Sequence, residues 1–527
     1  MSGISGIISF KKNLYAYKSY NRLLVRDMAT ALTHRGPDGA DEWVGEHAAF
    51  ANTCLLTPDT ANAKQPVKRT VEGYEFVITY DGELYNAHHL RNDLIGRGYI
   101  FETDSDTEVL LYGYIHYGED FCKMLDGVYA FAIWDSMRQQ VYICRDRLGA
   151  KPFFYAKCGE TFVFASEIKA LFRYPYLKPR ITKDGLCEIF GMSPLKTPSS
   201  GIFEDICELP PGHFLVINRN TVTTKKYWDC LYKEHTDSFE ETKEHVKELL
   251  HSSIKKRFST DTAVILSDDI SSDIIVSLCP TETKTENICT YSVNADTYLK
   301  HMCDILNFSD FPLPSAFLYF YSKINKKHSA VLSGLGCNEV FYITHHCSDS
   351  IFPWLYMREY VLKPAVKETL DLKSYTQARH EELCPNSVCV NLFLPALLSK
   401  ADTLSTASGV TVRTPFCDHT LVEYVLNIPD EMKESVLIET VRKILHRDDI
   451  SKKKSPHPIT HNTDYEKKVY ELLLNILNDY SSPILTFIDR ASVFELCTPR
   501  TLCKMTGFIE YLIQVNCWLK KFNPRIV

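Results

Sequence analysis

The feature that most constrains the fold of this chain is a change in the pattern of its apolar segments after Trp228. Before that residue, short runs rich in β-branched and aromatic side chains are separated by Gly, Asp or Asn turns, a pattern typical of β-strands. The expected strands are Ile4–Ser9, Phe76–Tyr80, Val128–Trp134, Gln140–Arg145, Thr161–Ala165 and His213–Asn218. The first part of the chain is therefore predicted to be β-rich, with short helices.

The second part of the chain contains two strand–loop–helix units. The run Ala263–Leu266 precedes a polar turn and the apolar segment Ile274–Leu278, and a similar arrangement begins at Ala330–Leu332. Repeated units of this kind predict a parallel sheet flanked by helices. Ser238–Phe258 and long stretches toward the C-terminus have a helical apolar rhythm, so we expect this part to be rich in helix.

Length, charge and cysteine usage exclude several classes of protein. The 527 residues suggest two to four domains of about 150 residues each. A net charge of −7 argues against a nucleic-acid-binding role, which needs a basic surplus. No apolar run approaches the roughly 18 residues of a membrane-spanning helix, and the N-terminus lacks the pattern of a secretion signal. Because the 18 Cys are dispersed and form no CxxC, we expect reduced thiols and a cytoplasmic protein.

Several short motifs occur in a distinctive order along the chain. Four of them, His34–Gly39, Asp81–Asn86, Thr103–Glu108 and Arg145–Pro152, together resemble the glutaminase domain of glutamine-dependent asparagine synthetase. Later segments resemble the synthetase domain of that family, and these are Leu209–His213, Tyr227-Trp228, Leu332–Gly336, Arg413–His419 and Lys452–Pro456. The resemblance covers essentially the whole chain.

The resemblance implies a fold and a reaction. Residues 1–195 would form an α+β glutaminase type-2-like domain with the αββα sandwich of N-terminal-nucleophile enzymes. Residues 196–230 would be a linker with the first synthetase contacts, and residues 231–527 an α/β ATP-pyrophosphatase-like domain. In that family, ammonia from glutamine hydrolysis passes through a tunnel and displaces AMP from adenylated aspartate, giving asparagine. Glutamine, aspartate and ATP would be the substrates and Mg²⁺ the cofactor.

Three positions of the glutaminase site depart from the family pattern. The nucleophilic cysteine, whose own α-amino group is the base, is replaced by Ser2; a serine can still serve as an N-terminal nucleophile. The arginine that holds the glutamine carboxylate is Cys54, counting back from Gln65-Pro66, a loss of about 1.5–3 kcal/mol. The oxyanion-stabilising asparagine is Asp81, and losing such a donor costs roughly 10²–10³ in rate. The positions that contact the substrate amine in the family are retained as Gly82, Glu83 and Asp106.

The phosphate-binding loop departs further. The family sequence Ser-Gly-Gly-Leu-Asp-Ser corresponds to Ser267–Ser272, in which both glycines are aspartates and the aspartate is Ser271. Each added carboxylate costs about 3 kcal/mol per phosphate charge at roughly 5 Å and an effective dielectric of about 20. A Mg²⁺ bridging either aspartate to phosphate is the alternative that would keep nucleotide binding. The resemblance assigns ATP contacts to Leu266, Ser267, Asp268, Asp269, Ser271, Ser272, Ser333 and Gly334.

The remaining synthetase positions lie in two later segments. Ser333–Glu339 resembles the family's Ser-Gly-Glu-Gly-x-Asp-Glu, with Leu335 in place of a catalytic glutamate and Asn338 in place of a metal-binding aspartate. Glu339 is retained as a hard anionic ligand of the kind that Mg²⁺ prefers. The lysine that steadies the transferring phosphate corresponds to Ser435, and a nearby arginine to Glu439.

These departures leave three hypotheses open. The first is a folded pseudoenzyme of the asparagine synthetase family, which would bind a metabolite, form a homodimer or pair with an active relative. The second is a working synthetase with remodelled sites. The third is an amidase that acts through Ser2 and has an inactive second domain. Arg413, Pro415, Phe416 and Asp418 are retained and are expected to be structural supports.

Overall fold

The computed structural model describes residues 2–55, 64–259, 261–267, 270–280, 282–287, 294–307, 309–313, 316–324, 327–341, 354–381, 388–445, 462–498 and 501–527. Two compact units are formed: Met1–Pro179 with Pro198–Asp229, and Arg180–Thr197 with Cys230–Val527. Among the described helices, none combines the length and the apolar character needed to cross a bilayer.

The first unit contains two six-stranded antiparallel sheets. One has the order β11 (Ile206–Glu208), β8 (Phe154–Cys158), β9 (Thr161–Ala165), β1 (Ser2–Ile8), β3 (Ala48–Cys54) and β2 (Gly39–Val44). The other has the order β13 (Val222–Lys226), β12 (His213–Asn218), β7 (Gln140–Arg145), β6 (Gly127–Asp135), β5 (Tyr74–Leu84) and β4 (Val67–Val71). The strands expected from the sequence are confirmed in both sheets.

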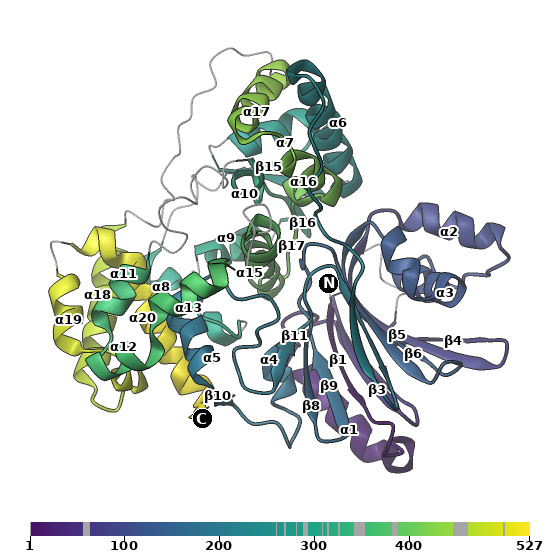
Figure 1. The fold of residues 1–527 in the computed structure, drawn as a ribbon, viewed down its shortest axis with the longest axis horizontal. Coiled ribbons are helices and arrows are strands. Elements are labelled where there is room, and N and C mark those ends of the chain that lie inside the picture. The colour runs from purple at the N-terminus through teal and green to yellow at the C-terminus, as the bar shows by residue number, and fades with distance from the viewer. Residues whose placement is uncertain are drawn as a thin grey trace. The chain divides into compact units, whose positions relative to one another are not determined.

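The two sheets pack against each other and are covered by helices on their outer faces (Figure 1). Alternate side chains of β6 serve two cores: Ala130 and Ala132 face the other sheet, whereas Phe131 and Ile133 face the helices α2 (Ala87–Gly96) and α3 (Asp106–Tyr117). Helix α1 (Lys18–Thr30) covers the outer face of the sheet that contains β1. The layer order is therefore helix, sheet, sheet, helix.

The second unit is built around a four-stranded parallel sheet. Its order is β15 (Thr285–Asn287), β14 (Thr262–Leu266), β16 (Ala330–Leu332) and β17 (Thr411–Arg413). Helix α7 (Ile270–Leu278) follows β14, and helix α10 (Cys337–Phe341) follows β16. Both predicted strand–loop–helix units are thus confirmed.

Helices make up most of the rest of this unit, as the sequence predicted (Figure 1). Helix α6 (Phe239–Arg257) begins with a capping box in which Ser238 and Glu241 bond each other's backbone N–H groups. The other helices are α5 (Lys183–Cys187), α8 (Ala295–Asp304), α9 (Ala316–Ile324), α11 (Leu355–Val361), α12 (Pro364–Leu370), α13 (Leu372–Glu381), α15 (Leu394–Ala407), α16 (His419–Leu426), α17 (Asp430–Leu445), α18 (Thr463–Asn478), α19 (Arg490–Leu496) and α20 (Leu502–Phe522).

Asp418 caps the N-terminus of α16 and joins it to α6. Its carboxylate accepts from Thr420 N and pairs with Arg257 Nη1 at 2.9 Å and with Lys256 Nζ at 3.0 Å. Burial would raise the pKa of Asp418, but Arg257 and Lys256 outweigh burial and hold the pKa well below its usual range. These contacts support a structural role for this retained residue.

Two candidate active sites

Three of the predicted glutaminase positions meet at the start of β1. Ser2 is the register partner of Cys54 on β3, and the backbone N–H of Ser2 donates to Asp81 Oδ1 at 2.9 Å. The three residues come from strands of both sheets, because β1 and β5 face each other across the core. The structure therefore brings Ser2, Cys54 and Asp81 together, as their predicted roles require.

Asp81 is held in a fully buried ion pair. Arg35 Nη2 donates to Asp81 Oδ2 at 2.8 Å, and both side chains are 0% exposed. Arg35 Nε also donates to the Ser2 carbonyl at 3.0 Å, while Lys151 Nζ lies 3.8 Å from Asp81 Oδ1. Arg35, Lys151 and one backbone donor thus surround the carboxylate that stands where an amide is expected.

A second buried carboxylate, Glu167, extends this network. Its Oε1 accepts from Arg35 Nη1 at 3.1 Å and lies 3.0 Å from His34 Nε2, while Lys169 Nζ is 2.5 Å from Oε2. Burial would raise the pKa of Glu167, but His34, Lys169 and Arg35 outweigh burial and hold it well below its usual range. The sequence analysis assigned no site role to these residues, although the charged segment at His34 and Arg35 was a usable signal.

Cys54 lies at the end of β3, between β1 and β2. Its carbonyl accepts from Asp38 N at 3.0 Å, and its register partner on β2 is Gly39. Burial and the neighbouring Asp38 carboxylate raise the pKa of the Cys54 thiol. A neutral thiol beside an aspartate offers no positive charge to a substrate carboxylate and is a poor nucleophile near neutral pH.

The retained amine-contacting positions lie where β5 meets α3. Gly82 has φ +155°, and a Cβ atom there would lie 2.2 Å from the Val128 carbonyl oxygen, so the close strand pairing requires glycine. Asp106, the first residue of α3, accepts the Leu84 N–H at 2.8 Å through Oδ2. Glu83, the residue after Gly82, is half-buried. The structure therefore keeps Gly82, Glu83 and Asp106 close together.

In the second unit, the loop after β16 contacts the first turn of α7, the helix that follows β14. The two strands are parallel neighbours, so their carboxyl ends lie at the same edge of the sheet. A Cβ atom at Gly334 would lie 1.9 Å from Ser271 Oγ, and Ser267 N donates to Ser272 Oγ at 3.4 Å. Ser333 N donates to the Arg413 carbonyl at 2.9 Å, and Leu266 is half-buried. Asp268 and Asp269 lie outside the described residues.

Leu335 contributes no charge to this edge of the sheet. It lines a small cavity together with Tyr321, Leu397, Lys400, Ala401 and Leu404. Burial lowers the pKa of Lys400, and Glu339 only partly opposes that shift. The position predicted to have lost a catalytic glutamate is therefore apolar and shares its cavity with the half-buried Lys400.

The two predicted metal positions lie on α10. Asn338 is exposed and Glu339 is half-buried, with its carbonyl accepting from Cys389 Sγ at 3.1 Å. Burial raises the pKa of Glu339. Within the described part of the chain, no group of three His, Cys, Asp or Glu side chains is placed to hold a metal ion. Of the two predicted metal positions, Glu339 alone carries a carboxylate.

The predicted phosphate-contacting position on α17 carries no cation. Ser435 is exposed, and Glu439 forms an ion pair with Arg442 on the same helix. Lys433, two residues before Ser435, is fully buried and pairs with Asp430 at 2.7 Å. Sequence reasoning did not single out this buried lysine, because its burial depends on how α17 packs.

Comparison with known proteins gives matches over both parts of the chain. Residues 1–228 match the glutamine amidotransferase domain family, and residues 282–520 match the asparagine synthase family. The chain is 32% identical to asparagine synthetase [glutamine-hydrolyzing] 3 of Bacillus subtilis (strain 168), over 99% of each chain. It is 31% identical to asparagine synthetase [glutamine-hydrolyzing] 1 of the same organism, over 65% of this chain and 58% of that relative.

Proposed function

The chain belongs to the family of glutamine-hydrolysing asparagine synthetases, and we propose that it is a folded member of that family that has lost catalytic turnover. In this proposal, residues 1–195 form the N-terminal-nucleophile domain and residues 196–230 the linker with the first synthetase contacts. Residues 231–527 form the ATP-pyrophosphatase-like domain. The helix–sheet–sheet–helix layers and the parallel sheet that contains β14 support these two domain types, while β11, β12 and β13 belong to the sheets of the first unit.

The observation that carries the proposal is the position of Asp81 beside the Ser2 nitrogen. In the family mechanism the α-amino group of residue 2 must be neutral to take a proton from its own side chain. A carboxylate 2.9 Å from that nitrogen favours the charged ammonium once Met1 is removed, so the base is lost. The same carboxylate would repel an oxyanion that forms nearby. Ser2 and Cys54 add to the loss. Ser2 does not supply the nucleophilic thiolate, and Cys54 does not supply the cation that would bind the substrate carboxylate.

The synthetase half of the proposal rests on missing charges. ATP, aspartate and Mg²⁺ are the family ligands proposed for the edge of the sheet near Ser333 and Gly334. Leu335 and Asn338 remove two carboxylates from that edge, and Ser435 offers no cation to a phosphate. If either Asp268 or Asp269 faces the nucleotide, it adds repulsion of about 3 kcal/mol per phosphate charge at roughly 5 Å and an effective dielectric of about 20.

The test uses the purified, folded full-length chain and a catalytically competent family member as the positive control. We expect no glutamine hydrolysis and no aspartate-dependent ATP–pyrophosphate exchange above background. Exchange that depends on aspartate would overturn the proposal in favour of a working synthetase. Hydrolysis that is abolished in Ser2→Ala would overturn it in favour of the amidase.

Restoring the family residues tests whether the three altered positions disable the glutaminase site or were wrongly assigned to it. The triple variant Ser2→Cys, Cys54→Arg, Asp81→Asn restores the family residues at the three altered positions. We expect measurable glutamine hydrolysis from this variant and none from Ser2→Cys alone, because Asp81 still binds the amino group in the single variant. Equal activity in the two variants would show that Asp81 is not what blocks the site.

A further inference from the structure

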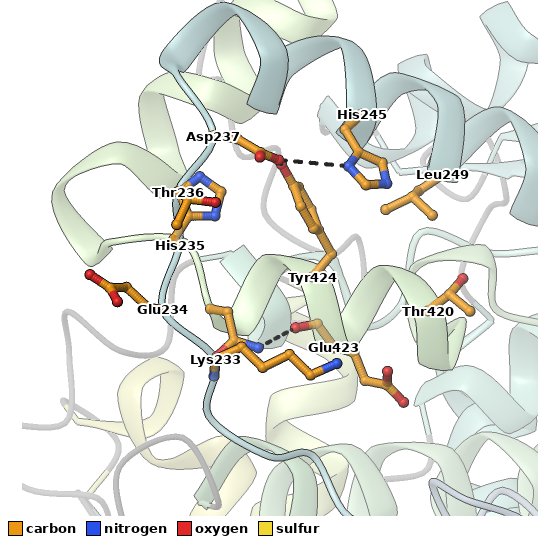
Figure 2. A pocket seen from close by; sticks show the side chains of 11 residues that line it. Lys233, Glu234, His235, Thr236, Asp237, His245, Leu249, Thr420, Glu423 and Tyr424 are labelled. Carbon is orange, nitrogen blue, oxygen red and sulfur yellow. Dashed lines mark hydrogen bonds and ion pairs between the residues drawn. The ribbon is translucent and has the colours of Figure 1, made fainter.

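A cavity of about 350 Å³ lies in the second unit (Figure 2), and its lining includes no residue of the loops after β14 and β16. One wall is the connecting segment (residues 230–238), which follows the last residue of the first unit in the chain. The other walls are α6 and α16. The lining residues are Lys233, Glu234, His235, Thr236, Asp237, His245, Leu249, Thr420, Glu423, Tyr424 and Asn427. Sites of this volume hold small organic molecules rather than single ions.

The connecting segment is fixed in place by its own bonds, so the cavity has a defined wall. Asn427 Oδ1 accepts from Lys233 N at 2.6 Å, and Tyr424 Oη donates to Asp237 Oδ2 at 2.6 Å. His245 Nδ1 lies 3.9 Å from the same Asp237 oxygen, and its ring is 4.2 Å from the ring of Tyr424. His235 Nε2 lies 2.9 Å from Thr242 Oγ1. These contacts leave the Lys233 side chain uninvolved.

The cavity presents charges of both signs. Lys233 and Glu423 extend along the same side of it, one from the connecting segment and one from α16 (Figure 2). In the described part of the chain, the Lys233 ammonium has no hydrogen-bond or ion-pair partner. Leu249 and the ring of Tyr424 add apolar surface on the opposite side. A cation, an anion acceptor and an apolar wall are therefore all within one small site.

We propose that this cavity binds a free α-amino acid with an apolar side chain. Lys233 receives the carboxylate, Glu423 receives the ammonium, and Leu249 and Tyr424 contact the side chain. A simple anion is disfavoured because Glu423 and Asp237 line the same space, and a simple cation is disfavoured by Lys233. A zwitterion is the small ligand that pairs with both signs of charge at once.

Isothermal titration of the full-length chain tests this assignment, with L-leucine and L-phenylalanine as probes. Neither is a substrate or product of the family reaction, so binding at the candidate active sites does not confuse the result. We expect saturable binding at millimolar concentration or below. For leucine, the two truncated analogues 3-methylbutylamine and 4-methylpentanoate should each bind at least about tenfold more weakly, the equivalent of one charged contact.

Two variants and a matched control locate the binding. Lys233→Met and Glu423→Gln should each weaken leucine binding by about tenfold, whereas Lys247→Met on the same helix as His245, outside the lining, should leave it unchanged. Absence of binding by both probes to folded protein would overturn the proposal. So would binding that Lys233→Met and Lys247→Met affect equally, or equal affinity for leucine and 3-methylbutylamine.

Discussion

The two candidate sites differ in how they treat a buried carboxylate. In the first unit, Glu167 is surrounded by His34, Arg35 and Lys169, and its pKa is held well below the usual range despite burial. In the second unit, burial raises the pKa of Glu339 and lowers the pKa of Lys400. Ion pairs therefore favour the charged form of the buried carboxylate in the first site. In the second site, burial shifts Glu339 and Lys400 toward their neutral forms.

Under the proposed function, this contrast illustrates two physical routes by which an enzyme site loses chemistry. At Asp81 the substitution adds contacts, because the new carboxylate pairs with Arg35 and accepts from the Ser2 N–H. At Leu335 the substitution removes a charge and leaves apolar surface beside the half-buried Lys400. The first route ties the altered residue into the stability of the fold, and the second does not.

The largest expected effect is a loss of stability when the Asp81 carboxylate is removed. Asp81→Ala should lower the free energy of unfolding of the first unit by about 3–5 kcal/mol, because Arg35 stays buried without its partner. Urea unfolding of the full chain measures this change. Asp41→Ala, at an exposed position on β2, is the matched control and should change stability by less than about 0.5 kcal/mol. A similar small change in Asp81→Ala would show that the ion pair is not a stabilising part of the unit.

The next effect concerns the acid sensitivity of the first site. Glu167→Gln should cost about 2 kcal/mol at neutral pH, since the charged hydrogen bonds to Arg35 and His34 and the ion pair with Lys169 are weakened. The folded-state pKa of Glu167 is depressed, so its stabilisation is present above the unfolded pKa of about 4.3 and is lost as the pH falls further. Melting temperatures measured from neutral to acidic pH should therefore converge for the variant and the parent. A constant difference across that range would contradict the assignment.

Sequence patterns predicted the strands of this fold better than its charge network. Strands such as β6 were predictable because β-branched and aromatic residues mark them. Strand β3 was not among the predicted strands, since its run Ala-Ala-Phe-Ala-Asn-Thr-Cys carries little of that signal although six of its seven residues are buried. Arg35 and Asp81 are 46 residues apart, and only the packing of the two sheets brings them together. Motif order predicted site roles for Ser2, Cys54 and Asp81, but the partners of these residues follow from tertiary contacts.

An effect of similar size is expected where Gly334 contacts the first turn of α7 in the second site. Gly334→Ala should destabilise the second unit by about 1–3 kcal/mol, because the new Cβ would lie 1.9 Å from Ser271 Oγ and 2.7 Å from Ser271 Cβ. Ser271→Gly in the same chain removes both atoms and should recover most of that loss. Urea unfolding of the single and double variants measures the recovery. If the double variant is no more stable than Gly334→Ala alone, Gly334 and Ser271 are not in contact in solution.

The smallest effect has the opposite sign to that of Glu167. The folded-state pKa of Glu339 is raised by burial, so the folded state keeps its proton longer and stability falls as the pH rises above the unfolded pKa of about 4.3. Glu339→Gln removes this loss and should stabilise the chain by up to about 1 kcal/mol at neutral pH, with no difference below about pH 4. Melting temperatures of Glu339→Gln and Glu167→Gln, measured over one pH series, compare the two sites directly. If both variants are destabilised at neutral pH, a cation compensates Glu339 as well, and the two sites handle buried charge in the same way.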